Sequence, residues 1–423
     1  MNCRNCNKAE LKKIIPIGKQ PLSGIFPRKK KLKLKKYSLD LFICKKCKLV
    51  QLGKSASAKD MFGEKYGYQS SISKLMRNHL YRIYTTLKKK KYIDNNSTVL
   101  DIGSNDGTFL NFFKKTKKLF GIDPTANKFK KFYKPHIKRI NSFFSFNKIY
   151  SIFGKNAYQK FDLVSSFAMF YDVNSPNLFC KDIYKILKPN GIWILELSYF
   201  PLLLKNLTYD QICHEHVSYY TLSVFKNLVE KNNFKIINVS LNEINGGSIQ
   251  IICTKSNSNK KVQNKSLISS ILKDEKKIKI KSYKKFNKRI FALKIKLINF
   301  LNRNQMKNIF GYGASTKGNI VLNYCGLNQK NLQYICDANK LKDGSYAPGS
   351  NIKIISKDLM RKIQPDFLFI LIWSFRKEVI KEEIKYLKKG GKLVFMLPRF
   401  HIVDKYNYKK YWKKDFKNQS YKY

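Results

Sequence analysis

Two glycine-rich turns, each placed between a short apolar strand and a helix, constrain the fold of this chain more than any other feature. The first turn follows residues 98–102 and contains Gly103 and Gly107, and the second lies at 311–319, after an apolar start at 308–310. Glycines at such a turn let the backbone pass close to a ligand at the carboxyl end of a strand. The sequence therefore predicts an α/β protein with two separate Rossmann-like halves.

Length and composition predict a folded protein of several domains. The chain has 423 residues, of which 43% are hydrophobic. At about 150 residues per domain this length predicts two or three domains, with enough apolar surface to bury their cores. The pattern of residue types divides the sequence into three blocks. The first, at 1–58, contains paired cysteines, the second, at 59–255, alternates predicted strands and helices, and the third lies at 256–411. The third block begins with apolar residues at helical spacing across 259–304, which predicts an amphipathic helical linker before the second Rossmann-like domain.

The charge of the chain is extreme but evenly spread. Its 85 basic and 27 acidic residues give a net charge of +58, and lysines occur in every segment. A nucleic-acid-binding face would concentrate the charge in one place. We therefore expect no specific nucleic-acid partner, although the positive field favours anionic ligands.

The location of the protein is predicted from the segments that it lacks. No apolar run reaches the roughly 18 residues that a membrane-spanning helix needs, and residues 1–10 contain no apolar signal region. We expect a cytoplasmic protein without a membrane span. Its nine cysteines then favour thiols and metal ligands over a disulfide framework. The sequence gives no indication of the oligomeric state.

Two Cys-x-x-Cys pairs predict a metal site near the N-terminus. Cys3 and Cys6 form the first pair, and Cys44 and Cys47 form the second. Each pair places two thiolates on one turn, and the two turns together complete the tetrahedral thiolate cage of a structural zinc site. Because four protein ligands leave no position for water, we assign this zinc to folding rather than to catalysis. A redox dithiol is the alternative.

Acidic residues at two strand ends predict a nucleoside site beside the first glycine turn. Asp101 lies near the end of the strand before the turn, and Asp123 ends the next strand about 20 residues later, where an acid can bind both ribose hydroxyls. An ordinary tight turn is the alternative for the glycines taken alone. The order of these elements, with a later strand at 161–166, resembles class I S-adenosylmethionine-dependent methyltransferases. The resemblance implies that the methyl donor is bound by Asp101, Gly103, Gly107, Asp123 and Ser166.

A His-Glu-His sequence at 214–216 follows the predicted fifth strand. No third ligand accompanies its two histidines, which disfavours a metal site. Packing or capping in the core is a second alternative. A histidine beside a carboxylate is typical of a general base, because the acid can set the tautomer and the pKa of the ring.

Five motifs occur in the order that is found in three-domain sugar C-methyltransferases, a family that the chain resembles to about Arg399. The motifs lie at 18–26, 68–71, 214–216, 246–248 and 311–319. Members join a small zinc domain, a methyl-donor domain and a C-terminal Rossmann-like domain, and methylate a carbon next to the ketone of nucleotide-activated deoxysugars. The resemblance implies S-adenosylmethionine and structural zinc as cofactors and a nucleotide-linked keto-sugar as substrate.

The resemblance also implies roles for single residues. His216 corresponds to the base that removes the proton beside the ketone, Glu215 to its partner, and Tyr68 to a tyrosine near the sugar and the donor. The chain departs from the family at Cys213, where Tyr is frequent, and at Asn245, where His is frequent. The residues implied in substrate binding are His214, Asn245, Gly246, Gly247, Gly313 and Lys317.

Two other functions compete with C-methylation through an enolate. O- or N-methylation of a sugar needs a base but no ketone. A nucleic-acid-binding protein on a methyltransferase fold is favoured by the charge, but the chain has no stripe of basic and aromatic residues that would bind RNA or DNA.

Overall fold

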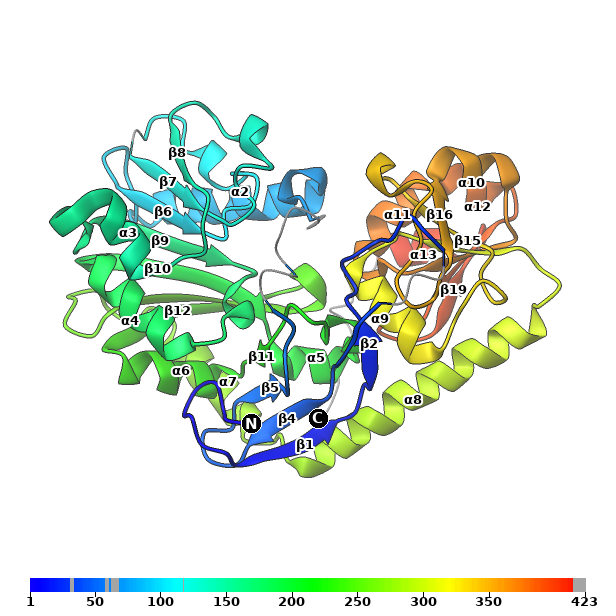
Figure 1. Ribbon diagram of the computed structural model, residues 1–423, viewed down its shortest axis with the longest axis horizontal. Helices are drawn as coiled ribbons and strands as arrows, with labels where there is room; N and C mark the ends of the chain where they lie inside the picture. Colours follow the sequence, from blue (N-terminus) through cyan, green and yellow to red (C-terminus); the bar gives the residue numbers. More distant parts are fainter. Residues whose placement is uncertain (31–33, 58–60, 62–67, 117, 414–423) are drawn as a thin grey trace.

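The computed structural model describes residues 1–30, 34–57, 61, 68–116 and 118–413, which form the three units visible in Figure 1. Within these residues the strands make sheets of four, seven and six members and one two-stranded ribbon. This architecture confirms the predicted α/β class with a small N-terminal domain and two α/β domains. The expected boundary between residues 58 and 59 lies outside the described residues. None of the described helices is long and apolar enough to cross a membrane.

The N-terminal unit is an antiparallel sheet in the order β1-β4-β5-β11, beside the ribbon of β2 and β3. Its fourth strand comes from the middle of the chain, because Ser218 pairs with Gln51 and Tyr219 pairs with Val50. This sheet therefore holds the segment that directly follows the His-Glu-His sequence. The strands of the unit are β1 (Leu11–Ile15), β2 (Lys19–Pro21), β3 (Lys36–Ser38), β4 (Leu41–Cys44), β5 (Val50–Leu52) and β11 (Ser218–Tyr219).

The central unit is a sheet in the order β12-β13-β10-β9-β6-β7-β8. β13 runs antiparallel to both of its neighbours, whereas the strands from β10 to β8 pair in parallel. The strand order reverses between β6 and β9, the point where open α/β sheets bind ligands. The strands are β6 (Val99–Ile102), β7 (Leu119–Ile122), β8 (Ile137–Ile140), β9 (Phe161–Phe167), β10 (Leu187–Ser198), β12 (Phe234–Asn242) and β13 (Ser248–Lys255).

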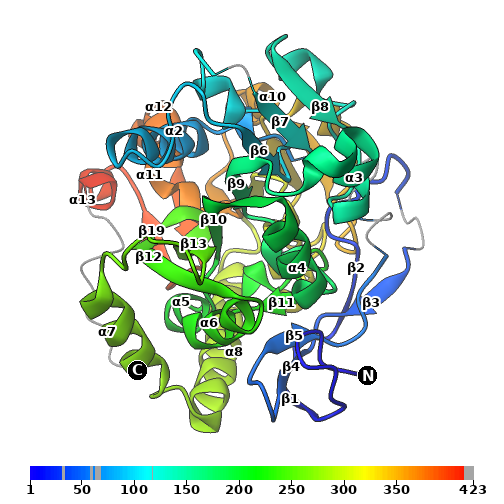
Figure 2. The ribbon, with the colours of Figure 1, turned by 90° about the vertical axis from the view of Figure 1, so that its left-hand side faces the viewer.

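Helices cover both faces of the central sheet (Figure 2). Successive residues of β10 alternate between the two cores, with Trp193 packed beside α4 and α6 and Ile194 packed beside α2. This is the period of two that a fully buried strand requires. The helices of the unit are α2 (Lys74–Lys89), α3 (Phe146–Phe153), α4 (Pro176–Ile186), α5 (Phe200–Asn206) and α6 (Leu222–Lys231).

The helical stretch predicted at 259–304 is two helices, α7 (Lys265–Glu275) and α8 (Ile280–Arg303). α7 packs on the central unit, because Ile271 lies in its core and Glu275 accepts hydrogen bonds from the first two backbone N–H groups of α6. α8 then runs from the N-terminal sheet to the C-terminal unit (Figure 1). Only α8 is thus a linker between domains.

The C-terminal unit is a sheet in the order β16-β15-β14-β17-β18-β19, parallel except for β19. This is the doubly wound order of a Rossmann fold, and the second glycine turn joins β14 to α9 as predicted. The elements are β14 (Ile309–Tyr312), α9 (Thr316–Cys325), β15 (Tyr334–Asp337), β16 (Lys353–Ser356), α10 (Lys357–Ile363), β17 (Phe367–Ile370), α11 (Arg376–Glu382), α12 (Ile384–Lys388), β18 (Lys392–Phe395), β19 (His401–Val403) and α13 (Tyr408–Lys413).

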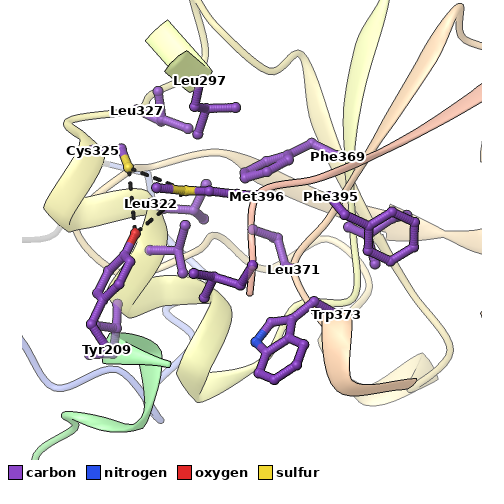
Figure 3. Close-up of a cluster of buried hydrophobic side chains, with 14 of the residues drawn as sticks. Tyr209, Leu297, Leu322, Cys325, Leu327, Phe369, Leu371, Trp373, Phe395 and Met396 are labelled. Carbon is purple, nitrogen blue, oxygen red and sulfur yellow. Dashed lines mark hydrogen bonds between the residues drawn. The ribbon is translucent and has the colours of Figure 1, made fainter. Parts of the chain in front are cut away.

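The central and C-terminal units share one hydrophobic core. Tyr209 of the central unit points into the C-terminal unit (Figure 3), where its hydroxyl lies 3.6 Å from Met396 Sδ and 3.7 Å from Cys325 Sγ. In the other direction, Trp373 donates a hydrogen bond of 2.8 Å from its indole Nε1 to Asp210 Oδ2. The same core continues into the N-terminal unit through β1, β4 and β5. The three units are therefore packed together around the segment at 200–220.

Candidate active site

The four predicted zinc ligands come together in the N-terminal unit. Their Sγ atoms all lie within 4.8 Å of one another, with Cys3 and Cys47 3.4 Å apart and Cys6 and Cys44 3.6 Å apart. The two turns follow the same course, because the residue after each pair has a positive φ and donates its N–H to the carbonyl of the first cysteine. Sulfur ligands at about 2.3 Å from a tetrahedral zinc stand about 3.8 Å apart. The cluster therefore fits a closed structural zinc site.

A cavity of about 310 Å³ lies at the carboxyl ends of β6 and β7. Asp101, Gly103 and Asp123, all predicted to bind the methyl donor, line it together with the predicted site residue Tyr68. Asp172, which the sequence reasoning did not select, lines it as well. The structure thus brings most of the predicted donor site to one place.

The two glycines of the first turn serve different purposes. Gly103 lines the cavity with a φ of +72°, and a Cβ there would stand 2.9 Å from the Met169 side chain. Gly107, with a φ of +74°, is not among the described residues that line the cavity, and a Cβ there would stand 2.7 Å from the Tyr133 ring. The Tyr133 hydroxyl donates a 2.8 Å hydrogen bond to the carbonyl of Asn105. Gly107 therefore allows the turn to pack against the Tyr133 ring and does not itself line the part of the cavity that the structure describes.

Asp123 is fixed in the position that a ribose-binding acid requires. Its Oδ2 accepts the N–H of Asn105 at 2.9 Å, and its Oδ1 accepts the N–H of Thr125 at 2.7 Å. Oδ1 also accepts the hydroxyl of Thr125. Of the about four lone-pair sites of a carboxylate, this leaves about one, on Oδ2, for a ligand hydroxyl. This geometry fits the predicted contact with the ribose of the donor.

Asp101 and the strand β9 require one correction. The hydroxyl of Ser165 donates a 2.7 Å hydrogen bond to Asp101, whereas Ser166 lies on the opposite face and accepts a 2.9 Å hydrogen bond from the Trp193 indole. Because successive strand residues face opposite sides, the expected donor contact of Ser166 does not fit its placement. Burial is the main cause that raises the pKa of Asp101 to about 7, and the nearby charge of Asp123 adds to it.

Two residues that the sequence reasoning passed over hold the Tyr68 segment on the cavity. The side chain of Asn105 accepts the N–H of Ser70 at 3.0 Å and donates to the carbonyl of Tyr68 at 3.2 Å. Asp106 accepts the N–H of Ser71 at 2.9 Å. Asn105 has a φ of +49°, and Asn is one of the few residues that tolerate such a backbone. In the sequence, the Asn-Asp pair within the glycine turn is the feature that could have indicated this contact.

His216 is buried, and its ring contacts Tyr171. Its ring packs against Tyr171 with the ring centroids 4.0 Å apart, and the residue after Tyr171 is the cavity-lining Asp172. The Nδ1 of His216 is buried and has no hydrogen-bond partner among the residues that the structure describes. Burial, followed by the charge of Lys317, lowers the pKa of His216 to about 3. The imidazole is therefore neutral at cellular pH and can accept a proton.

Glu215 does not contact His216 as expected. In the described part of the chain no hydrogen bond joins the two side chains, and the Glu215 Oε2 and the His216 Nδ1 are each buried without a partner. The Glu215 Oε1 lies next to Gly24, where a Cβ would stand 3.2 Å away. Burial raises the pKa of Glu215. Any support that Glu215 gives to the base is electrostatic rather than a direct bond.

His214 has a different partner from the one that the sequence suggested. Its Nδ1 lies 3.3 Å from Ser23 Oγ and its Nε2 lies 3.2 Å from the carbonyl oxygen of Gln20. Burial is the main cause that lowers the pKa of His214 to about 4. This histidine attaches the N-terminal segment to the central unit, so its expected contact with the substrate is replaced by a structural one.

Lys317 and Asn245 meet where the central and C-terminal units join. The Lys317 Nζ lies 3.4 Å from the carbonyl oxygen of Asn245. Burial lowers the pKa of Lys317, while the neighbouring Asp210 acts in the opposite direction. Gly246 has a φ of +90°, and a Cβ there would stand 2.9 Å from the Trp373 ring. The predicted substrate residues of the two units are thus brought together, and Gly246 permits their close approach.

The remaining two glycines of the predicted substrate site are explained by packing. Gly247 has a φ of +130°, and a Cβ there would stand 2.8 Å from the Leu202 side chain. Gly313 has a φ of +90°, and a Cβ there would stand 2.6 Å from Ile372. Neither position needs a ligand to account for its glycine.

Comparisons with known proteins agree with this layout. Family models of a zinc binding domain, a methyltransferase domain and a C-methyltransferase C-terminal domain match residues 3–62, 69–239 and 243–398. The C-methyltransferase NovU of Streptomyces niveus is 25% identical over 421 residues, which cover 95% of this chain and 96% of that protein. The chain thus has the domain order of a three-domain C-methyltransferase. It is an S-adenosylmethionine-dependent enzyme with a structural zinc site.

Solved structures resemble the central part of the chain. The PH0226 protein of Pyrococcus horikoshii is 18% identical and covers 44% of this chain and 94% of its own, with a TM-score of 0.35. The 1,6-didemethyltoxoflavin-N1-methyltransferase of Burkholderia thailandensis is 10% identical and covers 49% of this chain and 95% of its own, with a TM-score of 0.30. The domain order given above does not depend on these likenesses.

Proposed function

We propose that this enzyme methylates the carbon next to the ketone of a nucleotide-linked deoxysugar, and that His216 removes the proton from that carbon. The placement of His216 carries the proposal: it is a buried, neutral imidazole with an unpartnered Nδ1, packed on Tyr171, which precedes the cavity-lining Asp172. A C–H bond must lose its proton before the carbon acts as a nucleophile, and a positioned base supplies this step.

The ketone makes a weak base sufficient. It acidifies the neighbouring C–H, because the negative charge left on carbon spreads onto the ketone oxygen as an enolate. The charge of Lys317 reaches His216, as the lowered pKa of the ring indicates. A fixed cation in a buried site also stabilises developing negative charge. The Lys317 charge weakens His216 as a base, so it favours proton removal only through its attraction for the negative charge of the enolate.

The start of α9 supports recognition of a nucleotide-linked substrate. Ser315 caps this helix by accepting the N–H of Gly318 at 2.9 Å, and Lys317 lies in the first turn. Helix N-termini carry partial positive charge and exposed N–H groups, and they bind phosphates for that reason. The diphosphate of an activated sugar has the matching charge.

The residues that would hold the methyl donor are Asp101, Gly103, Asp123 and Tyr68, which line the cavity. When bound, S-adenosylmethionine supplies an electrophilic methyl group on its sulfonium. Asp123 would hold a ribose hydroxyl, and the carboxyl of Asp101 would attract the positive end of the donor. The Tyr68 segment, fixed by Asn105, would separate the reaction from water.

The proposal is tested with methyl-labelled donor and a panel of nucleotide-linked sugars, each keto-sugar paired with the matching alcohol. We expect label on the carbon next to the ketone, located by NMR, and no transfer to the alcohols. Label on oxygen or nitrogen, or equal transfer to the alcohols, would instead support O- or N-methylation.

A further inference from the structure

Asp172 is an acid of the active site to which the reaction described above gives no role. It ends the short helix η5 (Phe170–Asp172), directly after Tyr171, whose ring packs on His216 with the centroids 4.0 Å apart. The Asp172 side chain lines the donor cavity. This acid therefore lines the cavity predicted to bind the donor, one residue along the chain from the tyrosine that packs on His216.

The carboxyl of Asp172 lacks the contacts that a structural acid makes. Its Oδ1 is buried and has no hydrogen-bond partner in the described part of the chain. A comparable acid of the same unit, Asp182, accepts the N–H of Phe146 at 2.9 Å at the start of α3. A buried polar atom without a partner is destabilising, and a substrate group bound in the cavity would supply that partner.

A second carboxyl faces Asp172. Glu215 also has a buried oxygen, Oε2, without a partner among the described residues. Burial is the main cause that raises the pKa of Asp172, and the charge of Glu215 raises it further. Burial and a neighbouring negative charge both favour the protonated form of a carboxyl, and that is the form a proton donor needs. The other titratable groups facing the pair are Cys213 and Tyr219.

We propose that Asp172 is the general acid that donates a proton to the ketone oxygen of the substrate while His216 removes the proton from the neighbouring carbon. This proposal rests on the proposed function. The C–H bond breaks and an N–H bond forms at His216, and the O–H bond of Asp172 breaks as the ketone oxygen takes its proton. The product of the step is the neutral enol. When the carbon takes the methyl group the ketone is restored, the enol proton returns to Asp172, and His216 releases its proton to solvent.

The variant Asp172→Asn tests this role because it keeps the shape and removes the transferable proton. With S-adenosylhomocysteine bound, the wild type should exchange the acidic hydrogen of the keto-sugar with deuterated water. We expect exchange and methyl transfer to fall about 100-fold in Asp172→Asn, with donor affinity unchanged within about threefold. Asp358→Asn, an exposed acid-to-amide change in α10, is the matched control and should retain wild-type rates. Unchanged exchange in Asp172→Asn, with or without a loss of donor affinity, would overturn the proposal.

A second measurement reports the protonation state of the Asp172 carboxyl in the wild type. Carbon-13 NMR of the aspartate carboxyls, with the Asp172 signal assigned by its loss in Asp172→Asn, should show a protonated group at pH 7. An ionised Asp172 at that pH would rule out a general acid. The two proposals fail separately: a wild type that exchanges no keto-sugar hydrogen contradicts the proposed function, whereas wild-type exchange that survives in Asp172→Asn contradicts the general acid alone.

Discussion

Single side chains of the site owe their chemistry mainly to burial. Burial is the main cause that lowers the pKa of His216 to about 3 and raises the pKa of Asp101 to about 7. In both cases the neutral form is favoured, because a buried charge loses its hydration. The neutral ring has a free lone pair on one nitrogen but holds an added proton only weakly, and the neutral acid is ready to ionise when a cation binds.

Asp101 predicts a pH dependence of donor binding. The donor carries positive charge, so it binds the ionised carboxyl better, and affinity should rise as the pH rises through about 7. The free energy of unfolding of the donor-free protein should change in the opposite direction. The Asp101 carboxyl holds its proton more tightly in the folded protein than in the unfolded chain. Its contribution to the free energy of unfolding is therefore lost as the pH rises from about 4 to about 7. Calorimetric titration from about pH 6 to about pH 8 checks the first effect, and Asp101→Asn should flatten the profile. A flat profile in the wild type would contradict the assignment.

Asp123 predicts that its removal lowers the affinity for the donor. Asp123→Ala removes a charged acceptor for a ribose hydroxyl, and hydrogen bonds to charged groups are worth about 1.5–3 kcal/mol, so we expect a loss of about 10- to 100-fold. Thr125→Val, which removes only the hydroxyl that donates to Asp123, is a control for disturbance of the loop. Calorimetry with wild-type affinity in Asp123→Ala would show that the ribose is held elsewhere.

At the level of elements, β11 connects the zinc site to the base. The strand begins two residues after His216 and pairs with β5, which follows the second cysteine pair by three residues. The zinc therefore fixes a sheet whose edge strand positions the catalytic segment. The donor cavity lies at the carboxyl ends of β6 and β7, in a different sheet.

This arrangement predicts that loss of zinc separates catalysis from donor binding. The double variant Cys44→Ser, Cys47→Ser should lose the metal and most of the methyl transfer. Because the donor cavity lies at a different sheet, the variant should bind S-adenosylhomocysteine with a Kd within about threefold of the wild type, a change of less than about 1 kcal/mol. Metal analysis, calorimetry and turnover are measured on the same sample. Full turnover in zinc-free protein would mean that β11 does not depend on the metal.

The loop before β13 packs against the C-terminal unit at Gly246, and substitution there should weaken this contact. Gly246→Ala adds a methyl group against the Trp373 ring, whereas Gly326→Ala, at a similar positive φ, meets nothing within 4 Å. Both variants pay the backbone strain of about 1 kcal/mol, so the difference between them isolates the clash. We expect Gly246→Ala to lower the midpoint of thermal unfolding more than Gly326→Ala and to raise the KM for the sugar substrate. Equal effects of the two changes would contradict the close approach of the two units.

For the molecule as a whole, the sequence predicted the domain plan better than the contacts. Motifs that depend on local geometry, such as the cysteine pairs and the glycine turns, lie where they were expected. Contacts between distant segments were not predictable: His214 bonds to the N-terminal segment, and β11 joins the N-terminal sheet. The sequence also did not indicate which side of the sheet a strand residue faces. Ser165 and Ser166 are neighbours in the chain, but their side chains point to opposite sides of the sheet. Asp172 belongs to none of the sequence motifs, and its place on the donor cavity is visible only in the structure.

The central claim is that the three units assemble a site in which His216 removes a proton from carbon. It is tested most directly by hydrogen exchange at the keto-sugar carbon in deuterated water, with S-adenosylhomocysteine bound so that no methyl transfer follows. The wild type should exchange this hydrogen, and a folded His216→Asn variant with normal donor affinity should exchange it about 100- to 10,000-fold more slowly. Exchange at the wild-type rate in His216→Asn would contradict the account and assign the proton to another base.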